Sequence, residues 1–231
     1  MVRAISLFSG LALAFAASAD VIGHKDVQRF TESAPEIYLK FKPFLDVDTG
    51  CVPFPAVDKD GNISGGLKAA GDISGQCSES EGQLYARGRN HDGKFAIMYA
   101  WYFPKDQAVH GGGAGHRHDW EDVVVWLSSN SGDADFLGVA TSGHGDYTKT
   151  KASDMKDSMD GSRPLIQYFS NGITNHELQI TTAKGGEQAL IEWGALGSKA
   201  RAGLATSDAW GDAVMPMIDD NFKDKIAKAA L

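Results

Sequence analysis

The chain has 231 residues and carries 30 acidic against 22 basic side chains, a formal net charge of −8. This acidic balance argues against nucleic acid as a partner, and against docking on anionic lipid through a basic patch. A hydrophobic content of 42% argues against a disordered chain. The 27 glycines favour turns and short strands over long helices.

The first 19 residues have the order of a secretory signal peptide. Arg3 supplies positive charge, residues 4–16 are mostly apolar, and small residues follow at 17–19. The apolar run is too short to span a bilayer, and a buried N-terminal helix is the alternative. We predict cleavage before Asp20 and a secreted, extracellular protein. Removing 19 of 231 residues leaves one domain of 212 residues, 20–231, with net charge −9 and no transmembrane span.

The first half of the mature chain alternates between short predicted elements and turns. The segment most typical of a buried strand is 95–103, which is aromatic and almost without polar residues; Pro104 ends it. A polar, glycine-rich loop follows over 105–115. Before it we predict, in order, a surface helix at 24–30, a strand at 37–42 and mostly turns at 47–81.

In the second half, the pattern predicts more strands and then helices. Strands are expected at 123–127, 136–141, 165–169 and 178–182. Residues 188–193 could be strand or helix, whereas 198–204 and 221–230 look helical, the last capped by Asp220. We therefore predict a mainly β protein, a β-sandwich with a few peripheral helices. Strands and helices do not alternate regularly, which disfavours a parallel α/β sheet.

Two covalent features are expected before the strand at 95–103. Cys51 and Cys77 are the only cysteines, and in a secreted chain they most simply form one disulfide. Two buried free thiols are the alternative. Asn62 begins the only N-glycosylation sequon, in a stretch rich in glycine, aspartate and serine, so it is a possible glycosylation site.

Charged residues concentrate in Gly-His-Arg-His-Asp-Trp-Glu-Asp at 115–122, directly before the strand at 123–127. Side chains alternate faces along a strand, so Asp119 and Glu121 should point the same way. If the strands at 95–103 and 123–127 pair through the glycine-rich loop, Asp106 returns to the same sheet end. His116 sits at the loop end and is free to turn toward the same pocket. We therefore expect Asp106, His116, Asp119 and Glu121 to converge.

Three carboxylates brought together repel one another unless they are protonated or neutralised. A divalent cation is the simplest solution, and oxygen-rich ligands with one imidazole favour Ca²⁺ or Mg²⁺ over zinc. A solvated strand end with a salt bridge through Arg117 is one alternative. A cupin-like site using His116 and His118 is another, but on a strand Glu121 would face away from both histidines, and a second histidine cluster is not apparent.

Motifs of enzymes are missing from the sequence. It contains no His-Glu-x-x-His, Cys-x-x-Cys, Gly-x-Ser-x-Gly, phosphate-binding loop or dinucleotide-binding glycine motif, so we predict no catalytic residue and no enzyme. His144 and His176 lie in predicted turns. Each could close a pocket, although a turn residue hydrogen-bonded to backbone is the simpler interpretation.

Residues 115–121 and 96–106 resemble the two marked segments of the necrosis- and ethylene-inducing peptide-like proteins, which plant-associated microbes secrete. The Cys51–Cys77 pair fits the two-cysteine type of that family. Further similar segments lie at 51–58, 64–68, 215–217 and 220–222.

The resemblance implies a β-sandwich like that of actinoporins and some fungal lectins, with Ca²⁺ or Mg²⁺ in an acidic cavity. It assigns the metal environment to Asp106, His116, Asp119 and Glu121, with His144 and His176 near the sugar-binding side. It also implies a monomeric, secreted toxin and virulence factor. Such a cytolysin binds glycosylinositol phosphorylceramide, a plant sphingolipid, then damages the plasma membrane and provokes necrosis and immune responses.

Two departures from the family pattern keep other functions open. The loop from Asp106 to His116 is longer than usual and has extra glycines, and Gly172 stands where cytolytic members carry tryptophan. The second hypothesis is therefore a non-cytolytic relative that acts as a sugar- or lipid-binding module or an elicitor. A metal-dependent hydrolase or lyase on wall polysaccharide is a third and less supported hypothesis.

Overall fold

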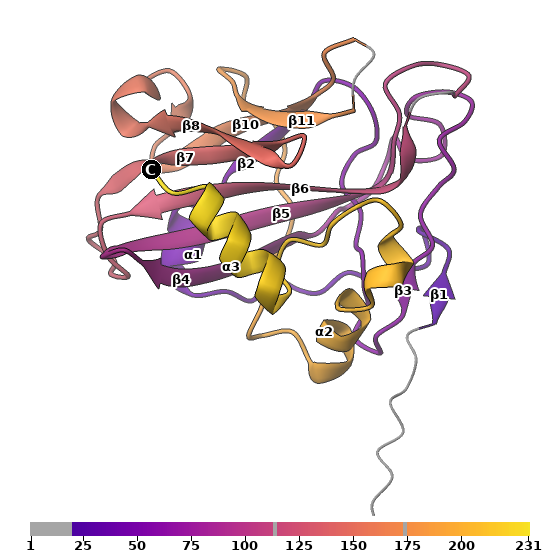
Figure 1. The fold of residues 1–231 in the computed structure, drawn as a ribbon, viewed down its shortest axis with the longest axis horizontal. Helices are drawn as coiled ribbons and strands as arrows, with labels where there is room; N and C mark the ends of the chain where they lie inside the picture. Colours follow the sequence, from indigo (N-terminus) through magenta and orange to yellow (C-terminus); the bar gives the residue numbers. More distant parts are fainter. Residues whose placement is uncertain (1–19, 113–114, 173–174) are drawn as a thin grey trace, which may run out of the picture.

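A computed structural model describes residues 20–112, 115–172 and 175–231, and it is mainly β, as predicted (Figure 1). The predicted signal peptide lies outside the described residues. The largest sheet has six strands in the order β12 (Leu190–Glu192), β4 (Leu84–His91), β5 (Lys94–Asp106), β6 (His116–Leu127), β7 (Phe136–Gly143) and β8 (Asp146–Lys151). The second sheet runs β11 (Glu177–Ile180), β10 (Arg163–Phe169) and β2 (Phe44–Val47), with β9 (Met159–Asp160) also pairing with β10.

The remaining elements are short. β1 (Val21–Ile22) pairs with β3 (Ile63–Ser64) in a third, two-stranded sheet. The helices are α1 (Glu36–Lys40), α2 (Ser198–Leu204) and α3 (Asp219–Lys228), with 3-10 turns η1 (Ala152–Asp154) and η2 (Ser207–Trp210). Among the described residues, no helix combines the length and apolar character needed to cross a membrane.

The two central strands, β5 and β6, are buried on both faces. On one face, Phe103 of β5 stacks on Tyr168 of β10 with ring centroids 3.8 Å apart. On the other, the indole N–H of Trp126 donates to the carbonyl of Ala229 at the end of α3, 2.9 Å away. α3 lies across that face of the six-stranded sheet in Figure 1. Because both faces are covered, β5 over 95–103 and β6 over 123–127 are almost continuously apolar rather than alternating.

Several predicted elements are confirmed with extended bounds. β5 extends the predicted strand at 95–103 to 94–106, and β6 begins at 116 instead of 123. The segment 188–193, left open between strand and helix, forms β12 beside β4. α3 begins at Asp219 after Ile218, so Asp220 lies in its first turn and is not the cap.

Two predictions near the N-terminus were wrong. The strand predicted at 37–42 is the helix α1, because the amides of Tyr38 and Leu39 bond the carbonyl of Pro35 and the Tyr38 side chain is buried in the core. The helix predicted at 24–30 is a single turn followed by irregular chain, in which the amide of Phe30 donates to the side-chain oxygen of Gln83. At 24–30 a contact with a residue 53 positions away overrides local preference, whereas α1 is held by its own backbone bonds and by burial of Tyr38. Strands β2, β4 and β8 were not predicted.

The predicted disulfide between Cys51 and Cys77 is present and fully buried. It closes a segment that packs beside the end of β5. There the buried ammonium of Lys105 donates to the carbonyl of Asp72 at 2.7 Å and to the side-chain oxygen of Gln107 at 2.8 Å. Burial lowers the pKa of Lys105. These contacts tie the residue before Asp106 to the segment that the disulfide closes.

The sequon asparagine is half-buried, and its side-chain amide donates to a carboxylate oxygen of Asp58 at 2.8 Å. Glycosylation of Asn62 stays a prediction.

Candidate metal-binding site

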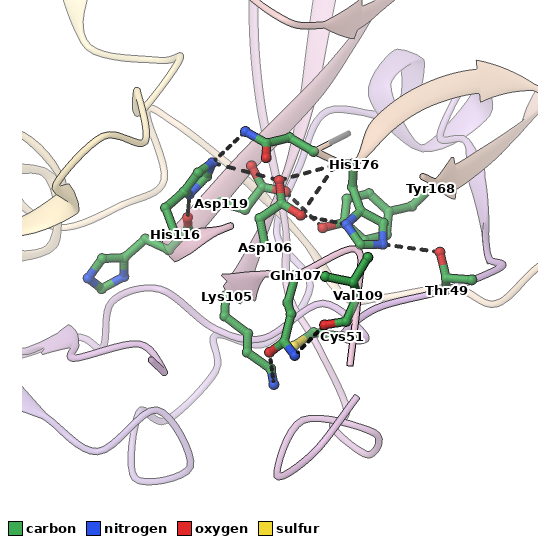
Figure 2. A network of polar contacts seen from close by, with 12 residues as sticks. Thr49, Cys51, Lys105, Asp106, Gln107, Val109, His116, Asp119, Tyr168 and His176 are labelled. Carbon is green, nitrogen blue, oxygen red and sulfur yellow. Dashed lines mark hydrogen bonds and ion pairs between the residues drawn. The ribbon is translucent and has the colours of Figure 1, made fainter. Parts of the chain in front are cut away.

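The hairpin of β5 and β6 brings three of the four predicted metal ligands together. Antiparallel pairing sets Asp106 opposite His116, and Phe103 opposite Asp119. One ligand atom from each of Asp106, His116 and Asp119 lies within 4.8 Å of the others. Both aspartates are buried, at 1% and 6% exposure. Figure 2 shows their carboxylates side by side.

One residue in the left-handed backbone conformation makes this convergence possible. In a regular strand His116 and Asp119 would lie on opposite faces, because faces alternate. Between them His118 has φ of +61°, a conformation that is uncommon for residues other than glycine. The His118 ring is buried, with Nδ1 2.7 Å from the hydroxyl of Tyr102, and burial lowers its pKa to about 4. His118 therefore does not join His116 in a cupin-like pair.

Glu121 faces the same cavity, which has a volume of about 240 Å³, but it is not part of the three-residue group. Its carboxylate accepts a hydrogen bond from the hydroxyl of Ser142. Burial and the charge of Asp119 raise the pKa of Glu121 well above its ordinary value. Asp119 and Glu121 thus share one cavity, as the strand alternation predicts.

The cavity is electrostatically unfavourable for its own carboxylates. Burial, reinforced by the charge of Asp106, raises the pKa of Asp119 to about 7. The ammonium of Lys225 also borders the cavity, but it lies 3.0 Å from a carboxylate oxygen of Asp122 and is paired there. A divalent cation would relieve the repulsion between the aspartates. Two carboxylates and an imidazole, completed by water, fit the oxygen-rich preference of Ca²⁺ or Mg²⁺.

The two histidines assigned by resemblance to the sugar side occupy different environments. His144 follows β7, lines the cavity, and has a half-exposed ring 3.9 Å from Glu177. The side chain of His176 is fully buried, and its Nδ1 lies 2.6 Å from Asp106. Gly172, the position of the missing tryptophan, is exposed.

Sequence reasoning missed three residues that contact the predicted ligands. Ser142 on β7 bonds Glu121, Tyr168 on β10 bonds Asp119, and Asn175 has its amide 3.2 Å from His116. Tyr168 belongs to a run of strand residues that looks like ordinary core. None of the three is near the 115–122 segment in sequence, so no local signal identifies them.

Comparison with known proteins agrees with this architecture. A family model described as "Necrosis inducing protein (NPP1)" matches residues 35–229. The chain is 41% identical over 219 residues to NLP effector protein 3 of Phytophthora capsici, covering 91% of each protein. It is also 41% identical over 220 residues to Necrosis-inducing protein NPP1 of Phytophthora nicotianae, again with 91% of each covered.

Similar solved structures share the fold. A structure described as NLPPya in complex with mannosamine superposes with a TM-score of 0.85 at 40% identity, covering 91% of this chain and 99% of that one. The non-toxic HaNLP3 protein superposes with a TM-score of 0.84 at 40% identity, covering 90% and 98%.

Proposed function

Because this chain belongs to the NPP1 family of necrosis-inducing proteins, we propose that it is a secreted, cation-dependent cytolysin that binds sphingolipid head groups of plant plasma membranes. The observation that carries the proposal is the group of buried Asp106, half-buried His116 and buried Asp119, which line one cavity. Two buried carboxylates that lie this close together repel each other unless protons or a cation reduce their charge, so their presence together favours an ion-binding role.

In this proposal Asp106, His116 and Asp119 hold a Ca²⁺ or Mg²⁺ ion, and Glu121 acts on it through water. The bound cation supplies positive charge and open positions for sugar hydroxyls or phosphate. Such a local site is needed because an acidic protein, of net charge −9 without the predicted signal peptide, gains nothing from bulk attraction to an anionic sphingolipid. His144 and Asn175 also line the cavity, and in this proposal they contact the sugar. A sugar ligand is supported by a similar structure that is described with mannosamine.

The test combines ion binding with membrane damage. Vesicles containing plant glycosylinositol phosphorylceramide are loaded with dye and mixed with the protein, with or without chelator. We expect leakage from the natural protein with Ca²⁺ or Mg²⁺ and none with chelator. Asp119→Asn should lose both ion binding in calorimetry and leakage. Asp157→Asn, a charge loss at an exposed position, should behave as the natural protein. Undiminished leakage from folded Asp119→Asn would reject the mechanism.

A second candidate is a non-cytolytic binding module or elicitor. Gly172 exposes no aromatic ring where interfacial tryptophan would help membrane contact, and a similar structure is described as non-toxic. The same vesicles separate the two functions. Cation-dependent co-sedimentation without dye release indicates a binder, whereas release indicates a cytolysin.

A further inference from the structure

Three aromatic rings form a stack that runs from the large sheet to the candidate metal site. Tyr168 on β10 lies over Phe103 of β5, with centroids 3.8 Å apart and planes at 9°. The ring of His176 lies 4.5 Å from that of Tyr168, also at 9°. All three residues are buried, with no more than 2% exposure. The stack therefore joins residues of both sheets through near-parallel ring faces.

Two members of the stack each bond one of the two aspartates. The hydroxyl of Tyr168 donates to Oδ2 of Asp119 at 2.8 Å. His176 has Nδ1 2.6 Å from Oδ1 of Asp106, and its backbone N–H donates to both oxygens of that carboxylate at 3.2 and 3.1 Å. Figure 2 shows His176 beside Asp106 and Tyr168 behind it. One pair of stacked rings is thus bonded to both carboxylates.

The outer edge of the stack is also fixed. Nε2 of His176 lies 3.1 Å from the hydroxyl of Thr49, which precedes the disulfide by two residues. With Nδ1 against Asp106 and Nε2 against Thr49, both ring nitrogens have a partner, so rotation of the imidazole would break two contacts. The side chain of His176 has no exposed surface.

We infer that Tyr168 and His176 are positioning residues that set the separation and orientation of the Asp119 and Asp106 carboxylates for the bound cation. The inference rests on the proposed ion site and extends it to residues outside the β5–β6 hairpin. Groups that hydrogen-bond metal ligands fix their orientation, and their loss weakens metal affinity by about 10- to 100-fold. On this inference His176 acts through Asp106 and not by touching sugar.

The competing explanation is that the stack is ordinary core packing. The hydroxyl of Tyr168 distinguishes the two, because its removal leaves the ring stack intact and changes only the contact to Asp119. Tyr99 is the matched control. It is a fully buried tyrosine on β5, and its hydroxyl donates to the backbone carbonyl of Tyr38 at 2.7 Å, so its removal also loses one buried hydrogen bond.

The experiment titrates Ca²⁺ and Mg²⁺ separately into the full chain by calorimetry, beside melting curves of the ion-free proteins. We expect Tyr168→Phe to weaken the binding of the better-bound ion about tenfold or more. Tyr99→Phe should keep the natural ion affinity within about twofold, because its hydroxyl lies outside the site. We expect this even if Tyr99→Phe lowers the melting temperature as much as Tyr168→Phe does.

Two changes at His176 give an independent measurement. His176→Phe keeps a ring in the stack but loses the contact to Asp106, and should weaken ion binding about tenfold or more. His176→Asn keeps a side-chain nitrogen near the Nδ1 position, and should retain more affinity than the phenylalanine variant. If Tyr168→Phe does not fold, this pair decides the question.

The outcomes separate the inference from the proposed function. Natural protein that binds an ion, with Tyr168→Phe or His176→Phe folded and equal in affinity, would overturn the positioning role alone. Natural protein that binds neither ion would overturn the proposed cation site and the inference together.

Discussion

The two buried aspartates of the candidate site, Asp106 and Asp119, are unfavourable for stability when both are ionised, although a cation site needs them ionised. Asp106 and Asp119 are buried close together, and the pKa of Asp119 rises to about 7 because burial and its neighbour's charge disfavour ionisation. In an ion-free molecule Asp119 therefore keeps its proton to a higher pH than an ordinary aspartate does. Cation binding requires the ionised form, so protons and cations compete for this residue.

The first prediction at this scale concerns pH. The unfolded chain has an ordinary aspartate pKa of 3.8, whereas Asp119 has about 7 when folded. Between these values the folded state binds more protons, so this residue's contribution to stability is present at low pH and is lost as pH rises towards 7. A divalent cation replaces the proton. The gain in melting temperature on adding Ca²⁺ or Mg²⁺ should therefore be small at about pH 5 and largest at about pH 8.

The measurement is a pair of melting curves, with ion and with chelator, at each pH. Taking the difference cancels the titration of carboxyl groups remote from the site. Asp119→Asn should show almost no ion-dependent gain at any pH. An ion-dependent gain in melting temperature of equal size at about pH 5 and about pH 8 would contradict the competition between protons and cations at Asp119.

At the scale of elements, the β5–β6 hairpin supplies all four predicted ligands, and one glycine lets its two strands approach. Gly115 precedes β6 with φ of +120°, and a Cβ built there would lie 2.3 Å from the carbonyl oxygen of Asp106. A side chain at this position is thus excluded twice, by backbone conformation and by contact with the strand that carries a ligand. This contact explains why glycine stands at position 115, directly before the charged residues of β6.

Gly115→Ala should therefore displace the end of β5, lowering the melting temperature and weakening ion binding about tenfold or more, as loss of ligand positioning does. Gly111→Ala is the matched control. Gly111 also has a left-handed φ, +84°, but a methyl group there would meet nothing within 4 Å, so the change should cost about 1 kcal/mol and leave ion affinity unchanged. Equal ion affinities for both variants, measured by calorimetry, would argue against the contact with Asp106 as the cause.

At the scale of the whole molecule, the disulfide connects the candidate site to the rest of the fold. It joins Cys51 to Cys77 across 26 residues of sequence. One end lies beside Thr49, which contacts His176, and the enclosed segment supplies carbonyl groups to Lys105. The bond therefore holds the chain on two sides of Asp106.

Replacing both cysteines by alanine should lower the free energy of unfolding by about 3.5 kcal/mol, from the loop-closure entropy of a segment of this length. For a domain of this size that corresponds to a fall in melting temperature of about 7–14 °C. Denaturant unfolding of the natural and double-alanine proteins, both assayed with chelator, measures it. A change below about 1 kcal/mol would indicate that Lys105 and its neighbours hold the segment without the covalent bond.

Much of the site was predictable from local sequence. The apolar run at 95–103 and the valines at 123–125 predict two buried strands, and the glycine-rich loop between them predicts their pairing. Strand alternation then places Asp119 and Glu121 toward one cavity. Each of these features depends on neighbours a few residues away, which a sequence displays directly.

The three-dimensional packing alone decided the rest. The left-handed backbone conformation of His118 depends on strain that the surrounding fold maintains. The hydrogen bonds from Ser142 to Glu121, from Tyr168 to Asp119, and between His176 and Asp106 join residues between about 20 and 70 positions apart in the chain. The same holds for α1, a segment of mixed local preference that was predicted as a strand and whose Tyr38 is buried in the core. Local preferences differ by about 1 kcal/mol, and long-range burial outweighs them.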